Sequence, residues 1–293
     1  MLSEFVPTVS LNQGERSKGF YMVFSNGLFR IFQVVALLLV ISSSGFCQSA
    51  MDTTRVLTLP SKFDSPANSD CPFPSGEKLS FDISCLISKV GSMELTFWGL
   101  VDHEGDDVLR VTTYSQGLGM KDWEEILACP EEWLPLLVRR EVFKAGLKTR
   151  VIENYDQDAF RVVVAPEGNP QQPTEIIDSD GRMQNVILLY YKFRMMQLQS
   201  GQNYHINLPR ESFQVRVGDV ETVSVPYGDY QARPLVSDPK KFTVWITSDG
   251  NPLPAKMVLK TNLGTYTFSL TGREVIVPKT AQSEPPSTLN NIQ

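Results

Sequence analysis

Residues 78–85 read KLSFDISC, and this stretch sets the pattern for most of the chain. The apolar residues Leu79, Phe81, Ile83 and Cys85 alternate with polar ones, so an extended backbone places the two kinds on opposite faces. This alternation is typical of a strand in an antiparallel sheet that packs one face on a core and turns the other face to water.

The same period of two recurs along the rest of the chain. Clear examples are residues 213–217, 242–247 and 265–271, and comparable segments lie between 93 and 165. The pattern predicts roughly ten to twelve strands. Because a sheet of that size must curl or close to protect its edges, we expect a mainly β fold: a curled antiparallel sheet, or an open or closed β-barrel.

Turn-forming residues separate these segments. They lie at 218–219 (Gly-Asp), at 227–229 (Tyr-Gly-Asp) and at 248–251 (Ser-Asp-Gly-Asn). Such residues favour tight hairpins, so we expect a meander in which consecutive strands pair.

One segment has a different period. Apolar and aromatic residues recur at helical spacing from Val186 to Arg194, with acidic residues at 178–180 to cap the start and Gly201 beyond the end. The sequence predicts one α-helix near 182–199.

The amino-terminal part has the organisation of an export signal. The apolar run IFQVVALLLVI at 31–41 follows Arg30 and precedes the stretch SSSGFCQSA at 42–50. A basic start, a short apolar core and small residues before a cleavage site are typical of a secretory signal peptide. We expect translation from Met22, cleavage within 47–50, and export to the periplasm or the outer membrane.

Two other uses of this segment are less favoured. An uncleaved membrane anchor needs roughly 20 apolar residues, about twice the length of the apolar core. Lipid attachment at Cys47 needs a small residue before the cysteine, and Phe46 is bulky.

Composition divides the chain into four parts. Residues 1–50 hold the extension and the signal, and residues 51–72 lack periodicity and carry turn formers, which indicates a linker. Residues 73–277 form the single β-domain. Residues 278–293 have no apolar repeat to offset their ordering entropy, so this tail is expected to be disordered.

Charge and rare residues narrow the function. A net charge of −6, a pI near 5.1 and the lack of a basic run outside the amino terminus argue against nucleic acid as a partner. Two histidines and four cysteines leave little material for His-based or thiol-based catalysis. If Cys47 leaves with the signal and Cys85 is buried, Cys71 and Cys129 are the pair that could form a disulfide. The cysteine spacing matches no zinc pattern.

Four blocks in a fixed order carry a family resemblance. They are FPSGEKLSFDIS at 73–84, the helical segment 185–194, VETVSVPYGDYQA at 220–232 and FTVWITSDGNPLP at 242–254. They resemble the bacterial family catalogued as domain of unknown function 3108, and the similarity covers about residues 71–272. The resemblance implies an exported, β-rich envelope protein and brings no catalytic residue with it.

The family-like positions are Phe73, Gly76, Glu77, Asp82, Gly91, Arg194, Pro226, Gly228, Trp245, Asp249 and Pro254. The chain departs from the family pattern at Cys85, where an aromatic residue is more familiar, and in the insertion-like stretch 120–135.

Catalytic and metal sites have no specific signature. The chain lacks a G-x-S-x-G elbow for a nucleophilic triad. The polar stretch 102–107 (DHEGDD) does not follow the calcium-loop pattern, and we interpret it as a solvated hairpin tip. Structural roles account for Glu77, at a strand start, and for Asp82, on a polar strand face. We therefore expect no catalytic, cofactor-binding or metal-ligating residues.

Aromatic residues are the remaining lead. Those that could line the concave face or the rim of the sheet are Trp98, Trp123, Trp133, Tyr190, Tyr191, Tyr227 and Tyr230. Core filling is the alternative, and it is favoured for Tyr190 and Tyr191 because they lie on the helical stripe. Trp123 and Trp133 lie in acidic, irregular sequence and are expected at a rim.

These observations predict an exported, non-catalytic envelope protein that binds a lipid, another small hydrophobic ligand or an envelope glycan in the curve of its sheet. The alternatives are a scaffold or interaction module without a pocket, and a hydrolase built on two carboxylates. A filled interior favours the scaffold, whereas a cleft with two acids about 5–10 Å apart is the minimum for the hydrolase.

Overall fold

The structure, a computed structural model, describes residues 72–167, 173–262 and 264–277. The predicted signal peptide and tail, and the predicted linker apart from Pro72, lie outside the described residues.

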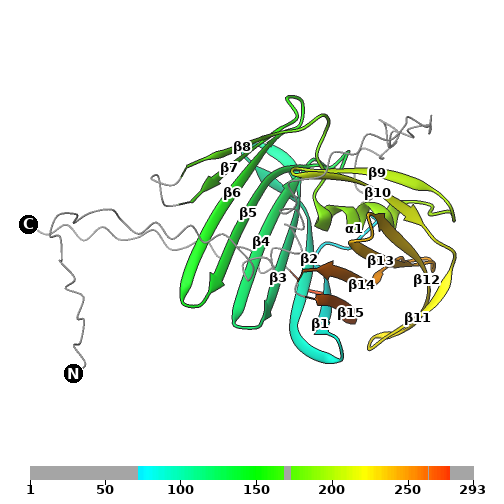
Figure 1. The fold of residues 1–293 in the computed structure, drawn as a ribbon. Helices are drawn as coiled ribbons and strands as arrows, with labels where there is room; N and C mark the ends of the chain where they lie inside the picture. The colour runs from blue at the N-terminus through cyan, green and yellow to red at the C-terminus, as the bar shows by residue number, and fades with distance from the viewer. Residues whose placement is uncertain (1–71, 168–172, 263, 278–293) are drawn as a thin grey trace, which may run out of the picture.

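Fifteen strands and one helix form within the described residues (Figure 1). The strands before the helix are β1 (Glu77–Cys85), β2 (Ser88–His103), β3 (Asp106–Gly117), β4 (Met120–Ala128), β5 (Pro135–Lys144), β6 (Leu147–Asp156), β7 (Arg161–Pro166) and β8 (Glu175–Asp178). The helix is α1 (Val186–Met195). The strands after it are β9 (Asn203–Leu208), β10 (Glu211–Val217), β11 (Glu221–Val225), β12 (Gly228–Asp238), β13 (Phe242–Thr247), β14 (Pro254–Thr261) and β15 (Gly264–Val275).

All strands belong to one antiparallel sheet. Its order is β8-β7-β6-β5-β4-β3-β2-β1-β15-β14-β13-β12-β10-β9, with β11 paired to β12. The first strand pairs with the last one, from Glu77 opposite Val275 to Cys85 opposite Tyr266. The sheet curls around α1 and does not close into a barrel, because β8 and β9 are not paired with each other. The prediction of a mainly β, curled antiparallel sheet with one helix is confirmed.

A polar segment before α1 bridges the two ends of the sheet. The Gln184 side chain accepts from the Asn207 backbone N–H in β9 at 2.6 Å, and the Asn207 side chain donates to Ser179 Oγ at 2.8 Å. Arg210, after β9, forms an ion pair with Glu175 at the start of β8. Side chains therefore join β8 and β9 where strand hydrogen bonds do not.

The helix is shorter at both ends than the predicted 182–199. Asn185 caps it, since its side-chain oxygen accepts from the backbone N–H groups of Ile187 and Leu188, and no acidic residue lies in the first turn. The residues before Asn185 make the bridge to β9 instead. At the other end Met196 has an extended backbone, so the helix stops before Gly201. None of the described residues form a helix with the length and apolar character that a membrane span requires.

Two predictions about strands are wrong. Residues 120–128, read as irregular, form β4, which pairs along its length with β3 and β5. Gly218-Asp219 is not a hairpin turn, because β10 pairs with β12 rather than with β11. The hairpins at 227–229 and 248–251 are confirmed by the pairing of β11 with β12 and of β13 with β14.

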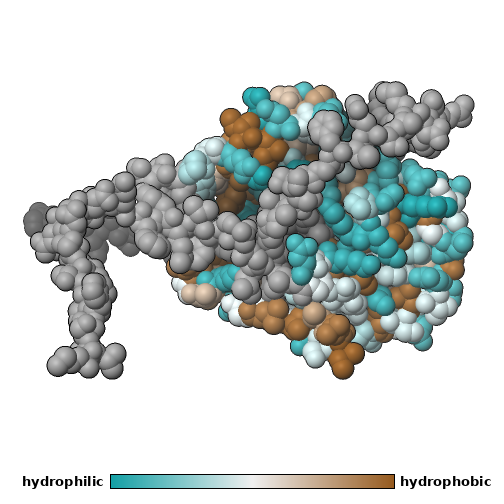
Figure 2. Space-filling view, in the orientation of Figure 1, coloured by the Kyte–Doolittle hydropathy of each residue, from teal (hydrophilic) through white to brown (hydrophobic). Residues whose placement is uncertain are grey.

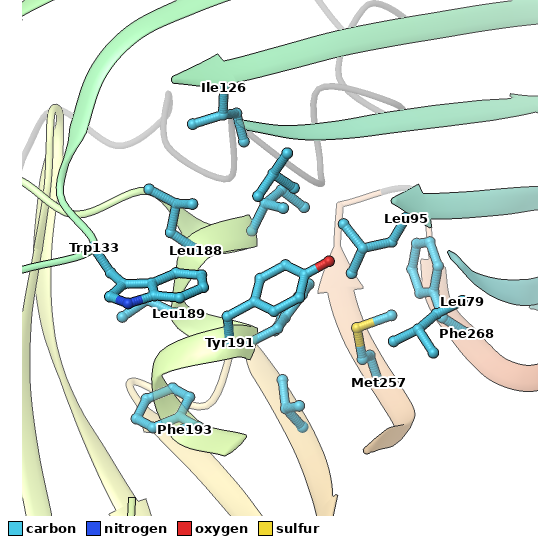
Figure 3. Close-up of a cluster of buried hydrophobic side chains, with 14 of the residues drawn as sticks. Leu79, Leu95, Ile126, Trp133, Leu188, Leu189, Tyr191, Phe193, Met257 and Phe268 are labelled. Atoms are coloured by element: carbon cyan, nitrogen blue, oxygen red, sulfur yellow. The ribbon is translucent and has the colours of Figure 1, made fainter. Parts of the chain in front are cut away.

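The core lies between α1 and the inner face of the sheet. Alternate residues of the strands point inward, as Leu79, Phe81 and Ile83 do in β1, and meet the helix residues Ile187 and Leu188. Figure 3 shows this cluster with strand side chains around the helix. Each fully buried side chain of this size contributes roughly 1.5–3 kcal/mol, so helix and sheet stabilise each other.

Gly76 has a conformation and surroundings that exclude other residues. Its φ is +82°, and a Cβ there would lie 1.8 Å from the carbonyl oxygen of Ile276. The close approach holds the two ends of the domain together, because the Ile276 N–H donates to the Gly76 carbonyl at 2.9 Å.

We expect Gly76→Ala to lower the free energy of unfolding by about 2–4 kcal/mol, through backbone strain and displacement of the Ile276 carbonyl. Gly105→Ala is the matched control: Gly105 also has a positive φ, +95°, but nothing lies within 4 Å of its Cβ position. Gly105→Ala should lower the free energy of unfolding by about 1 kcal/mol. Urea denaturation of both variants measures the difference, and equal losses would contradict the proposed contact.

Candidate functional site

Three of the predicted site aromatics are part of the core rather than a binding surface. Trp133 stacks on Tyr191 and on Phe97, with ring centroids 5.6 and 5.7 Å apart, and Phe73 contacts all three rings edge-on. Figure 3 shows Tyr191 between Trp133 and Leu95. The prediction that Trp133 lies at a rim is wrong, because its side chain fills the interior between α1 and the sheet. Core filling is confirmed for Tyr191 and for Tyr190.

The other predicted aromatics lie apart from one another. Trp98 donates from Nε1 to Thr112 Oγ1 at 2.8 Å and stays half-buried, while Trp123 is 36% exposed on β4. Tyr227 is exposed in the turn between β11 and β12, and Tyr230 is half-buried two residues into β12. The seven aromatics do not form one groove.

The interior has little free space. A cavity lined by Met93, Tyr190 and Phe268, among others, measures about 30 Å³, room for about one water molecule. The helix and the core aromatics occupy the place where a concave ligand site would lie. Around this cavity, the described part of the chain therefore leaves no space of ligand size in the curve of the sheet.

The family-like residues Glu77 and Arg194 form a fully buried ion pair. Arg194 Nη1 and Nη2 donate to the two Glu77 carboxylate oxygens at 2.7 and 2.9 Å, and both side chains are 0% exposed. Arg273 in β15 donates to the same carboxylate at 2.9 Å, and Arg194 Nε donates to the Pro252 carbonyl at 2.6 Å. The Phe73 ring lies 4.0 Å from the guanidinium. We call these groups the Glu77 node; it joins β1, α1, β15 and the β13–β14 turn.

The remaining family-like residues have structural roles as well. Gly91 lies against β3, and a Cβ there would be 2.3 Å from the Gln116 carbonyl oxygen. Asp82 pairs with Lys89 at 2.6 Å, and Asp249 accepts from Thr247 Oγ1 at 2.8 Å.

Three further family-like residues mark strand ends. Pro226 lies in the β11–β12 turn, Gly228 begins β12, and Pro254 begins β14. Trp245 is the one family-like residue that lies in the wall of a surface groove.

A second buried polar cluster lies on β4, β5 and β6. Arg140 forms a bidentate pair with Asp122, one bond at 2.9 Å, and the Asn185 amide donates to Glu124 at 3.4 Å. Tyr155 donates to Glu153 at 2.7 Å. Burial raises the pKa of Glu124 to about 7, and the positive charge of Arg140 opposes only part of that effect.

This cluster does not have the form of a hydrolase site. The cavity that Glu153, Tyr155 and Arg210 help to line measures about 30 Å³, so a sugar ring does not fit beside the carboxylates. The polar groups instead seal the end of the sheet near β8 and the start of α1.

A surface depression of about 400 Å³ lies on the outer face of β12, β13 and β14. Val244 and Ile246 of β13 point to the core, so Thr243 and Trp245 point outward into the groove. We call it the outer groove. Its lining is apolar along the floor and basic at one end, and consists of Glu221, Pro234, Val236, Lys240, Lys241, Phe242, Thr243, Trp245, Val258 and Lys260.

The lining of the outer groove combines the indole of Trp245 with the ammonium groups of Lys240, Lys241 and Lys260. Trp245 Nε1 donates to Glu221, Lys256 Nζ lies 5.4 Å from the Trp245 ring, and Lys241 pairs with Glu211. Lys240 and Lys260 are exposed. Indole faces bind apolar ring faces and ammonium groups bind anions, so the groove suits a ligand that has both. Sequence analysis included Trp245 only as a family-like residue and did not predict the groove, because strand pairing brings its lining residues together.

The described residues contain no cluster of side chains suited to metal binding, and the two described cysteines are free thiols. Within 72–167, 173–262 and 264–277, no three His, Cys, Asp or Glu side chains are placed to hold a metal ion. Residues 102–107 form the tip between β2 and β3, as predicted. Cys129 is a free thiol that donates to Glu131 at 2.9 Å, Cys85 is a half-buried free thiol, and Cys71 lies outside the described residues.

The curled sheet around one helix and the Glu77 node define a β-rich domain with an internal helix. Residues 80–271 match the model of the family described as protein of unknown function, DUF3108, and the chain belongs to that family.

Two solved structures show limited similarity. A β-barrel-like protein of the domain of unknown function DUF1849 from Brucella abortus is 12% identical, with a TM-score of 0.43, over 69% of this chain and 98% of that one. A candidate exported protein with a YmcC-like fold from Bacteroides fragilis is 8% identical, with a TM-score of 0.24, over 69% and 96% of the two chains. No curated protein matches.

Removing the charge of Glu77 should cost about 3–5 kcal/mol of unfolding free energy, because Glu77→Gln leaves the Arg194 guanidinium buried without its counter-charge. The control is Glu94→Gln, which breaks the surface pair with Lys78, where the Glu94 side chain is 46% exposed. That loss should stay below about 1 kcal/mol. Denaturant melts of both variants test this, and a small loss for Glu77→Gln would contradict a structural role for the node.

The raised pKa of Glu124 makes stability depend on pH. Its protonated form is favoured in the folded state, so its contribution is complete below the unfolded pKa near 4.5 and is lost as the pH rises through about 7. The loss is at most about 3 kcal/mol. We expect Glu124→Gln to reduce the fall in unfolding free energy between pH 5 and pH 8, measured by urea denaturation.

The control for this experiment is Glu141→Gln. Hydrogen bonds from Lys148 and Arg150 lower the pKa of the partly exposed Glu141, so its titration lies below that pH window. Its profile should therefore run parallel to the wild-type profile, and a parallel profile for Glu124→Gln would show that Glu124 is not the group responsible.

Proposed function

We propose that the protein is an exported, non-catalytic binding protein of the bacterial envelope, with an acidic, glycan-like component as its ligand in the outer groove. The observation that carries the proposal is the groove itself: about 400 Å³, with Trp245 and three lysines in its lining. That volume falls within the range typical of small-molecule sites. The signal-like segment at 31–41 supports export.

The chemistry of the lining supports an acidic sugar over a purely apolar ligand. The C–H face of a sugar ring can pack on the indole and on Pro234 and Val236, while its acid groups pair with Lys240 and Lys260. A fully apolar ligand would leave these ammonium groups near an apolar surface without counter-charge.

The number of carboxylates in the groove lining supports binding without catalysis. Among the described residues that line it, Glu221 supplies the one carboxylate, and that carboxylate accepts a hydrogen bond from Trp245. A glycoside hydrolase of the usual kind needs two carboxyl groups, one on each side of the bond that it cleaves.

The second candidate function is an envelope scaffold that binds partners through its surface and has no small ligand. The filled interior favours this candidate.

Isothermal titration with the phosphorylated core oligosaccharide released from lipopolysaccharide tests the proposal, with neutral maltohexaose as the control sugar. We expect binding of the phosphorylated sugar that weakens with salt, and a loss of roughly tenfold or more in affinity in Lys240→Gln/Lys260→Gln, because each exposed contact to an anion contributes about 1 kcal/mol.

Lys89→Gln/Lys148→Gln is the matched control, since it removes two exposed lysines outside the groove and should bind the sugar as the wild type does. Equal affinity of both double variants, or equal binding of maltohexaose, would remove the support for the groove and leave the scaffold.

A further inference from the structure

Three turns lie in a row along one end of the sheet. They join β1 to β2, β3 to β4 and β5 to β6, and these six strands are consecutive neighbours. Because strands are about 4.8 Å apart, successive turns are separated by about 10 Å. Figure 1 shows the three turns side by side at the lower ends of these strands. We call them the apolar rim.

The apolar rim exposes large hydrophobic side chains. Leu86 is 89% exposed and Ile87 is 100% exposed in the first turn, Leu118 is 56% exposed in the second, and Phe143 and Leu147, at 43% and 70%, flank the third. Figure 2 shows hydrophobic surface along this lower margin of the molecule. Exposed apolar residues are ordinary one at a time, but a row of them on consecutive turns indicates a contact surface.

The backbone conformation of these turns does not favour leucine. Leu86 and Leu118 have positive φ values, +55° and +48°, a conformation in which Asn, Asp and Gly are favoured. At the other end of the sheet, positive φ values occur at Glu104 (+59°) and also at the apolar residues Trp133 (+55°), which is buried in the core, and Phe160 (+54°). Leucine in place of a polar residue therefore costs turn stability and solubility, which points to a role in binding.

Each turn also carries lysine and no acid. Lys89 follows the first turn, Lys121 the second, and Lys144 and Lys148 flank the third, with no Asp or Glu within 85–89, 117–121 or 143–148. Lys89 and Lys148 pair with Asp82 and Glu141 on the adjacent strand surface, at 2.6 and 2.8 Å. Such exposed pairs are weak, so the ammonium groups remain able to bind other anions.

The opposite ends of the same strands have the reverse charge. The turn between β2 and β3 contains Glu104, the turn between β4 and β5 contains Glu131 and Glu132, and the segment between β6 and β7 contains Asp158. An anionic surface therefore attracts one end of the sheet and repels the other, which fixes the orientation of the domain.

We propose that the apolar rim docks on an anionic phospholipid membrane, with Leu86, Ile87 and Leu118 inserted at the level of the headgroups and the adjoining lysines on the phosphates. Apolar side chains with neighbouring lysines are the combination that binds proteins to such surfaces without a membrane span. A protein partner would bind a rim of this kind through a complementary acidic and apolar patch, and the vesicle experiment separates the two.

The outer groove opens at the same end of the sheet. Lys240 and Lys241 lie in the β12–β13 turn and Lys260 near the end of β14, and the following turn leads to Gly264, where a Cβ would lie 3.3 Å from Cys85 Sγ. Docking through the rim places the groove at the membrane surface. The membrane contact does not depend on what the groove binds.

Flotation of the purified protein with vesicles tests docking, using equal parts phosphatidylglycerol and phosphatidylcholine against phosphatidylcholine alone. The wild type should float with the anionic vesicles, less so as salt rises. Leu86→Ser/Ile87→Ser should lower the bound fraction at least tenfold, and Lys121→Gln should lower partition to anionic vesicles by about fivefold.

The matched control is Leu100→Ser/Leu136→Ser, which removes two leucines of 52% and 38% exposure from the strand surfaces. It should float as the wild type does, and circular dichroism should show all variants folded. Absence of wild-type flotation, or equal flotation of Leu86→Ser/Ile87→Ser and the control, would overturn membrane docking, the latter pointing to non-specific adsorption. Loss of sugar binding in Lys240→Gln/Lys260→Gln is a separate readout that concerns the groove alone.

Discussion

The buried pair of Glu77 and Arg194 is the constraint on which the rest of the structure depends. Apolar packing has no direction, so the helix could in principle slide or rotate inside the sheet. Two charges with 0% exposure allow one position only, because each needs the other in hydrogen-bonding geometry. Arg273 and the Pro252 carbonyl extend the same requirement to β15 and to the β13–β14 turn. These contacts fix the position of α1 inside the curled sheet.

A filled interior determines where this protein can meet other molecules. The concave side of the sheet is occupied by Tyr191, Trp133 and their neighbours, and for this reason we propose binding on the convex side and at the ends of the strands. These are the places where the structure has a groove with Trp245 and turns with exposed leucines. Both proposed binding surfaces therefore lie on the outside of the sheet, unlike the sites of barrels that enclose their ligands.

Sequence periodicity predicted the fold class and the helix, and it failed where polar side chains point inward. In β4, Asp122 and Glu124 are buried, so this strand reads as irregular and acidic although it is central to the sheet. Trp133 follows that stretch, and the sequence predicts it at a rim for the same reason. The groove could not be predicted, because strand pairing brings Lys240, Trp245 and Lys260 together. The leucines of the turns were visible in the sequence, but their common position depends on the order of the strands.

Pairing of the first strand with the last one has a consequence for how the domain is completed. One edge of β1 receives its partner only when residues 264–275 are available, after every other strand has been made. Until then β1 exposes unpaired backbone groups, the feature that leads nascent sheets to associate with one another. When the chain emerges from its amino-terminal end, β1 therefore stays without one of its two partners until β15 is present. A truncation that removes β15 would leave that edge of β1, at the start of the domain, unpaired.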